Sequence, residues 1–572
     1  MKKGSLPIAI AVTGHRDLRP QDIPILEAQV EKIFSQLEQE HSSSPLVLLS
    51  SLAEGADRLA ARIALKRGIK LVCPLPMPRA LYEDDFSSEE SKKDFADLLD
   101  KSDEWFELPL LSGSSYEDIS KPGELRNHQY AFVGAYLSRH SQIIIAMWDG
   151  NPVELVGGTT YVVGFKLHGI PPPYIFKQGR FDQEEIGPVY HILTPRATHE
   201  APEGTAGTLK VIYPDAFGSD DAAKSNYDRV MRDTNRFNED EISMGSDLQD
   251  ERTQSASYLL SGDLQRLKEK ASDVLISCFS VSDTLAIFFQ KQTLKFLGVL
   301  FAFALMATVV FELYAYLMLD YPILLLLFFM ILGGAYSVYL YTAKKAYQAK
   351  FLDYRTLAEG LRIQFYWKQI GIRFSVANYY LGDQHSELDW IRHALRIWSL
   401  PFTEDSKKLI ETETNTEADR WNLLMEDWVK SQHHYFVRSS KKETNKVKKL
   451  NLWARIALIL GFLLIAFNMI YQYFIGHTPL LTFLYISSVT PIAAGLFYGY
   501  SEKRALADHV KQYERMATLF AKAETRLLKL ITESNFEEAR NLVFDLGKEA
   551  LKENGRWVLT HRERPIEFPI TQ

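Results

Sequence analysis

The chain has 572 residues and a formal net charge of −7; 46% of its residues are hydrophobic and 24% are charged. This length predicts roughly three or four domains, and the acidic balance, with no stripe of Arg and Lys among aromatics, gives no reason to expect direct nucleic-acid binding. The only two cysteines, Cys73 and Cys278, exclude a disulfide framework and a cysteine-rich zinc site and fit a reducing compartment.

Short apolar runs alternate with helical stretches at the start of the chain. The expected strands are Ile8–Val12, Leu46–Ser50, Leu71–Leu75 and Gln142–Trp148, and Ile23–Gln39 has the apolar spacing of a helix. This alternation is typical of a parallel, doubly wound sheet with helices on both faces. We therefore predict an α/β domain over residues 1–215, whose ligands would bind beyond the carboxyl ends of the strands.

Glycine-bearing turns follow three of these strands. Glycine lets backbone N–H groups approach an anion closely, and a helix N-terminus adds a favourable dipole and free donors. Gly157–Thr160 is the best candidate for a phosphate cradle, although a glycine after a strand also serves as an ordinary tight turn. The pattern matches neither the Gly-x-Gly-x-x-Gly fingerprint nor a Walker loop. The predicted ligand-binding residues are Gly14, His15, Arg16, Asp17, Leu52, Glu54, Gly55, Ala56, Asp57, Arg58, Asp149, Gly150, Gly157, Gly158, Thr159 and Thr160.

These residue types suit a nucleotide-like anion. His15 and Arg16 would supply ring nitrogens and a cation, whereas Glu54 and Asp57 would accept hydrogen bonds from ribose hydroxyls or a base. The histidines lack metal-ligand spacing. We predict no metal, no resident cofactor and no catalytic residue.

The chain changes character after the α/β domain. We expect a polar connector over 216–254, a first helical unit over 255–390, a cytoplasmic helical linker over 391–445 and a second helical unit over 446–572. Apolar residues from Leu260 to Val281 recur in alternating four and three steps, which is typical of a coiled-coil seam. This face would pack either in a homo-oligomer or within one subunit.

Four apolar stretches interrupt the helical units. They are Phe296–Met318 and Pro322–Tyr341, then Leu452–Ile475 and Leu480–Tyr500. Each is near the ~20 residues that an α-helix needs to cross ~30 Å of hydrocarbon. Lysines and arginines flank the outer ends of each pair, while the short turns between paired stretches carry none. The positive-inside rule then predicts two hairpins in the inner (plasma) membrane, with all soluble segments and both termini in the cytoplasm.

The two pairs resemble an internal repeat. A shift of 159 residues (503 − 344) superposes Lys344 on Lys503, and it also superposes Tyr354 on Tyr513. Apolar residues then recur in alternating four and three steps in both copies. We expect each outgoing membrane helix to continue as a long cytoplasmic helix that packs against others.

Two parts of the chain resemble known families. Val12–Arg16, Ser50–Asp57 and Trp148–Gly150 with Gly157–Thr159 resemble the SLOG superfamily of Rossmann-like nucleotide-binding domains, over about the first 175 residues. Tyr354–Arg362, just after a predicted hairpin, is similar to SLATT paired-helix membrane effectors. The resemblance implies a component of bacterial conflict (antiphage) immunity: the SLOG part would sense a cyclic oligonucleotide or an ADP-ribose derivative, and the SLATT part would act on the lipid bilayer.

Two alternatives stay open. Some SLOG relatives are phosphoribohydrolases with a glutamate soon after their glycine motif, but here Tyr161, Val162 and Val163 follow Thr160. Binding without turnover is therefore favoured over a membrane-anchored nucleotide or N-glycoside hydrolase, although Glu54 or Asp57 would be the substitute carboxylates. The second alternative is a membrane scaffold that binds no ligand.

Overall fold

The computed structural model describes the chain in nine segments and divides into two compact units. The described residues are 4–152, 155–175, 185–199, 202–245, 247–260, 270–380, 388–399, 417–476 and 478–566. The first unit comprises Met1–Glu251, Leu264–Val281 and Arg373–Asn415. The second comprises Arg252–Asp263, Ser282–Ile372 and Thr416–Gln572.

The first unit is built on a seven-stranded sheet with the order β4-β3-β2-β1-β5-β6-β7. All neighbours pair in parallel except β6 and β7, which are antiparallel. Chain order runs outward from β1 in one direction to β4, and then resumes on the other side of β1 with β5. The topological switch point of the sheet therefore lies between β1 and β5. The strands are β1 (Ile8–Gly14), β2 (Leu46–Leu49), β3 (Lys70–Leu75), β4 (Glu104–Glu107), β5 (Ile143–Trp148), β6 (Val189–Leu193) and β7 (Leu209–Ile212).

Helices cover both faces of the sheet, as the alternation of its side chains requires. Ile8, Ile10 and Val12 pack on one face with apolar residues of α1, α2 and α4. Ala9 and Ala11 point to the other face, against α6 and α7. These helices and the smaller ones near them are α1 (Ile23–Glu40), α2 (Ala56–Lys66), α3 (Arg79–Glu83), α4 (Glu89–Lys101), α5 (Tyr116–Ile119), α6 (Glu124–His140) and α7 (Thr159–His168).

The predicted α/β sheet and its four expected strands are confirmed. Strands β4, β6 and β7 were not predicted from the sequence. In β4 only Phe106 is buried, and β7 is a partly exposed edge strand, so neither shows a continuous apolar run. β6 has the sequence VYHIL, in which a polar residue interrupts the apolar ones.

Residues 216–254, expected to be a polar connector, contain helices α8 (Asp220–Met244) and α9 (Gln249–Ser257). Asn238 of α8 is fully buried; its side chain accepts a hydrogen bond from the Leu6 amide and donates one to the Leu6 carbonyl, both at 2.8 Å. Phe237 is also fully buried. Buried side chains of this mostly polar helix thus join α8 to the residues just before β1.

The expected helical linker 391–445 is shared between the two units. Helix α13 (Asp389–Trp398) packs on the sheet through Ile397, and the Trp398 indole donates to the Ser5 carbonyl at 3.2 Å. The later part of this segment lies in the second unit, in α15 (Glu417–Leu423), a π-helix (Leu424–Lys430) and the start of α16.

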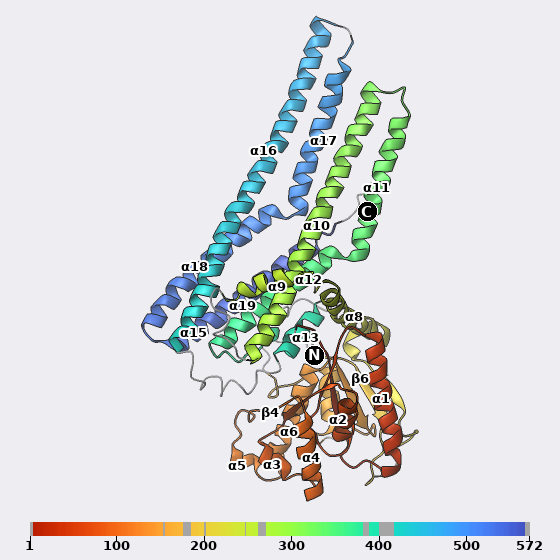
Figure 1. Cartoon of the computed structure of the whole chain (residues 1–572), viewed down its shortest axis with the longest axis vertical. Helices are drawn as coiled ribbons and strands as arrows, with labels where there is room; N and C mark the ends of the chain where they lie inside the picture. Colours follow the sequence, from red (N-terminus) through yellow and green to blue (C-terminus); the bar gives the residue numbers. More distant parts are fainter. Residues whose placement is uncertain are drawn as a thin grey trace. The chain divides into compact units, whose positions relative to one another are not determined.

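The second unit is helical (Figure 1). Among its described residues, four helical segments, which include α10, α11, α16 and α17, are long and apolar enough to cross a membrane. Large apolar side chains on them are exposed, and Phe462, Tyr473 and Phe474 are 70%, 82% and 75% accessible. Such surfaces are typical of lipid-facing helices. The helices not yet given are α10 (Lys270–Leu317), α11 (Ile323–Lys345), α12 (Tyr347–Gln369), α16 (Ser431–Phe474), α17 (Leu481–Lys503), α18 (Leu506–Thr532) and α19 (Phe536–Arg562).

The predicted repeat is visible in the backbone. Ala346 separates α11 from α12 with φ 50°, and Ala505 separates α17 from α18 with φ 51°. These alanines are 159 residues apart (505 − 346), the same shift that superposes Tyr354 on Tyr513. Because non-glycine residues rarely adopt the left-handed region, the recurrence of this break supports two copies of one helical pattern.

The predicted seam from Leu260 to Val281 is only partly described, since 261–269 lie outside the described residues. Its last residues, Cys278 and Val281, are 1% and 2% exposed inside the chain itself. A Cβ added at Gly4 would lie 2.8 Å from a Val281 methyl group. This part of the seam packs within one subunit.

Candidate functional site

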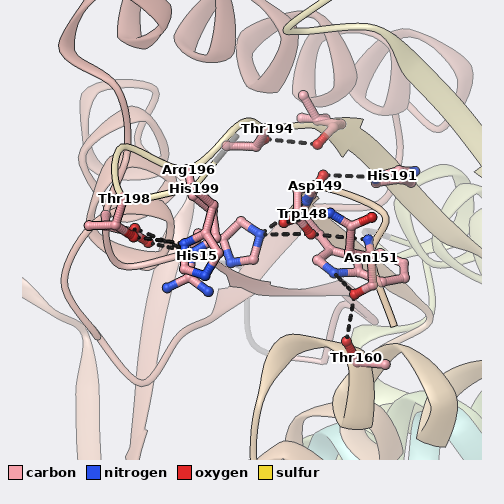
Figure 2. Close-up of polar contacts among 12 residues, drawn as sticks. His15, Trp148, Asp149, Asn151, Thr160, His191, Thr194, Arg196, Thr198 and His199 are labelled. Atoms are coloured by element: carbon pink, nitrogen blue, oxygen red, sulfur yellow. Dashed lines mark hydrogen bonds and ion pairs between the residues drawn. The ribbon is translucent and has the colours of Figure 1, made fainter. Parts of the chain in front are cut away.

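The ends of β1 and β5 meet at the switch point of the sheet. Gly14 pairs with Met147, and the His15 amide donates to the Met147 carbonyl at 3.0 Å. The His15 ring then reaches Asp149: its Nε2 accepts from the Asp149 backbone N–H at 3.0 Å and lies 3.2 Å from Asp149 Oδ1 (Figure 2). The structure thus brings together two of the predicted site residues from turns 134 residues apart.

The surroundings of His15 disfavour its charged form. Burial lowers the pKa of His15 below its ordinary value, and this effect exceeds the opposing attraction of Asp149. A neutral ring agrees with the geometry, because Nε2 accepts a backbone hydrogen bond only when it carries no proton. Protonation would break that contact and favour the Asp149 carboxylate or a bound anion instead.

The turn between β2 and α2 fits under the turn after β1. Gly55 has φ +79°, and an added Cβ would lie 2.4 Å from the carbonyl oxygens of both His15 and Arg16. The Ala56 amide donates to the His15 carbonyl at 3.1 Å, so the N-terminus of α2 abuts the first turn. Leu52 is fully buried with φ 57°, a conformation that surrounding structure must enforce.

Arg16 is the exposed cation of this edge. Its guanidinium lies 5.4 Å from the centre of the Tyr130 ring, within cation–π distance. Tyr130 and Arg126 both donate to the Asp85 carboxylate, and the Arg126 contacts measure 3.0 and 2.7 Å. Arg16 therefore stands beside a ring that Asp85 holds in place.

Glu54 and Arg58 build the turn instead of facing open space. The Glu54 carboxylate accepts from the Ser87 amide at 3.0 Å, from the Ser87 hydroxyl at 2.7 Å and from the Ser91 hydroxyl. Burial alone would raise the pKa of Glu54, but these hydrogen bonds lower it. Arg58 donates to the Leu52 carbonyl at 3.0 Å and pairs with Asp94 at 3.1 Å.

Asp57 lies beneath the same turn and is 6% exposed. Burial raises the pKa of Asp57 to about 7, against the opposing influence of a backbone hydrogen bond from Ala53 and the charges of Arg16 and Arg58. At neutral pH the side chain is therefore partly protonated. It has the proton affinity of an acid–base group, but it is enclosed by protein.

The third turn leads into α7. Gly157 has φ +83°, and a Cβ there would lie 2.6 Å from the Asn127 carbonyl of α6, so this glycine sets the close approach of α7 to α6. Gly158 caps α7 without a side-chain hydrogen bond. The Thr160 hydroxyl donates to the Asn151 carbonyl at 3.4 Å, which links Thr160 to the Asp149 turn (Figure 2). Gly150 has φ +85°, and Thr159 is the first residue of α7.

A fourth segment, Thr194–His199, follows β6 and was not predicted to be part of the site. Arg196 pairs with Asp17 at 3.0 Å, and the Ala197 amide donates to the Asp17 carbonyl at 2.8 Å. Asp17 thus holds this segment in place. Figure 2 shows Arg196 and His199 of the segment beside His15. The sequence does contain a signal for this segment, because polar residues follow the strand VYHIL directly. If β6 had been recognised as a strand, these residues would have been expected at the same edge of the sheet as the other turns.

Within the described residues, no group of three or more His, Cys, Asp or Glu side chains is arranged to hold a metal ion. Comparison of the chain with protein-family models, with curated proteins and with solved structures gave no match.

Proposed function

We propose that this chain is a membrane effector controlled by a nucleotide-derived anion that binds at the β1/β5 switch point. The observation that carries the proposal is the meeting of His15 and Asp149 across that point, beside the exposed Arg16. Open α/β sheets bind ligands at this position. The N-termini of α2 and α7 lack side-chain caps, which suits phosphate oxygens.

The membrane part of the proposal rests on the four apolar helices. Together with the loop charges, they favour two hairpins whose soluble segments all lie in the cytoplasm. The division between the two units falls within α10, at residues 281 and 282, so one continuous helix belongs to both. Ligand binding would shift this helix between two states only through a difference in affinity for them. Permeabilisation of the membrane in bacterial immunity, in the manner of SLOG–SLATT fusions, is the proposed outcome.

One observation favours the hydrolase alternative: the pKa of Asp57 is raised to about 7, as in a general acid or base. However, Asp57 is enclosed, and Glu54 is engaged by Ser87 and Ser91. Neither carboxylate is placed to activate water at a bound sugar. Sensing without turnover is the better account of this geometry.

The test is a thermal-shift screen of the full-length protein in detergent against nucleotides, cyclic oligonucleotides and ADP-ribose. At least one is expected to raise the melting temperature without being consumed. Gly158→Leu should abolish that shift, because its side chain would stand at the N-terminus of α7, where the phosphate is proposed to bind. The backbone should tolerate the change, because φ at Gly158 is −77°. Gly164→Leu, on the same helix with nothing within 4 Å of its Cβ, is the matched control and should keep the shift. Turnover of the bound nucleotide would favour the hydrolase, and no shift with any nucleotide would favour the scaffold.

A further inference from the structure

A cavity of about 540 Å³ lies inside the helical unit, outside the apolar stretches. Its walls come from α10 and α12 of the first repeat, from α16 and α18 of the second, and from α9, α19 and the π-helix Leu424–Lys430. The lining residues of α10 end at Gln290, and those of α12 begin at Phe351, so the cavity lies next to the predicted membrane segments. This volume is within the ~300–1,000 Å³ typical of small-molecule sites, and π-helical turns occur frequently at functional sites.

Aromatic rings form much of the wall. Phe351 and Trp557 are in edge-to-face contact with centroids 5.6 Å apart, and Tyr513 lies 5.9 Å from Phe436 and 6.3 Å from Tyr435. All five side chains line the cavity. Their electron-rich faces favour a cation, and their apolar surface favours an organic body attached to it.

The cationic groups of the wall are already neutralised by carboxylates of the same wall. Arg355 pairs with Asp283 at 2.9 Å and with Glu359 at 2.5 Å, and Arg362 donates to both oxygens of Glu359 at 3.0 and 2.9 Å. These two arginines therefore have little charge to offer an anionic ligand. An anion would also have to compete with Asp283 and Glu359 at close range.

Glu553 is a wall carboxylate whose ion-pair partners, Arg515 and Arg556, are both exposed arginines. It is 8% exposed, and its nearest cations are Arg515 at 3.6 Å and Arg556 at 3.8 Å, both beyond hydrogen-bond distance. Within the described part of the chain, its carboxylate makes no hydrogen bond. Since neither arginine is within hydrogen-bond distance, the Glu553 carboxylate can accept a hydrogen bond from a donor that a ligand brings into the cavity.

We infer that the cavity binds a small protonated organic amine, whose ammonium group donates to Glu553 and whose apolar body lies against the rings of Trp557, Tyr513 and Phe351. Residues of both repeats line the site. A bound amine with a higher affinity for one arrangement of the two repeats would therefore shift the equilibrium toward that arrangement. This inference does not depend on the nucleotide site.

The test is titration of the full-length protein in detergent with phenethylamine, followed by fluorescence of its tryptophans. Phenethyl alcohol and phenylacetate, of similar size but neutral and anionic, are the charge controls. The amine is expected to bind saturably and at least about tenfold more tightly than either control, because a charge-assisted hydrogen bond to a buried carboxylate is lost with them. Equal binding of amine and alcohol, or no saturable binding of the amine, would overturn the inference.

Two cavity variants and one control variant locate the effect. Glu553→Gln keeps the shape of the side chain and should weaken amine binding at least about tenfold. Asp545→Asn, an exposed position of α19 where the carboxylate pairs with Lys548 at 2.9 Å, should leave it unchanged. Ala550→Phe fills the cavity from α19 without changing charge and should abolish binding even if Glu553→Gln does not fold. Undiminished binding by both Glu553→Gln and Ala550→Phe would place the amine elsewhere and refute the site.

Discussion

Replacement of Asp57 by asparagine should stabilise the α/β unit at neutral and alkaline pH. Asp57 is buried under the β2–α2 turn, and burial raises its pKa to about 7 from the ordinary value of 3.8. The folded state therefore holds this proton more tightly than the unfolded state. The stability of the wild-type protein falls as pH rises from about 4 to about 7, and the penalty stays constant above that range.

The size of the effect follows from the two pKa values. A difference of about 3 pH units corresponds to roughly 4 kcal/mol, as an upper bound. An asparagine side chain would carry no such penalty, and its amide oxygen retains the ability to accept the Ala53 hydrogen bond. The stability difference between variant and wild type should thus be small near about pH 4.5, grow to its maximum near about pH 7 and then level off.

The assay is amide hydrogen exchange of β1 and α2 in the full-length protein, together with the apparent melting temperature, across this pH range. Exchange reports the α/β unit itself, whereas a membrane protein with several units need not unfold in two states. Asp100→Asn, at an exposed position of α4, is the control and should show no comparable pH dependence. A variant that is less stable than wild type at about pH 8, or a difference independent of pH, would refute the reasoning.

Two further predictions concern backbone geometry. Gly55→Ala should destabilise the α/β unit by at least about 2 kcal/mol, because its Cβ would lie 2.4 Å from the carbonyl oxygens of His15 and Arg16. The measurements are the melting temperature, which should fall, and amide hydrogen exchange in α2, which should become faster. Ala346→Val should lower the melting temperature by the equivalent of about 1–2 kcal/mol, whereas Ala346→Gly should keep or raise it, because only glycine adopts φ 50° without strain. Because Ala505 has the same backbone conformation, valine and glycine there should change the melting temperature in the same directions as at Ala346. An unchanged melting temperature with valine at either position would contradict this account.

The sheet was predictable because its central strands are buried on both faces and read as continuous apolar runs. Glycine turns after those strands placed the candidate site at the carboxyl edge, where His15 and Asp149 do meet. The edge strands β4 and β7 were not predictable in this way, since partial exposure removes the apolar run. For the same reason α8, a mostly polar helix with a narrow apolar stripe, was taken for a connector.

Side-chain partners explain what the sequence did not reveal about the site. Glu54 was expected to face a ligand, yet its acceptors are occupied by Ser87 and Ser91, which lie more than 30 residues further along the chain. Similarly, Asp17 is paired with Arg196, which follows a strand that was not predicted. The cavity at Glu553 is formed by several helical elements that are far apart in the sequence, so no local pattern marks it. The partners of these side chains are set by tertiary contacts, which cannot be read from the spacing of residues along the chain.

The most direct test of the central claim is hydrogen–deuterium exchange of the full-length protein in detergent, with and without saturating ADP-ribose or a cyclic dinucleotide. The switch-point site predicts slower exchange at residues 14–17, 55–58 and 158–160, because phosphate oxygens would engage those turns and helix N-termini. It also predicts that Gly158→Leu removes this protection. Nucleotide-dependent protection elsewhere, with these three turns unchanged, would contradict the account.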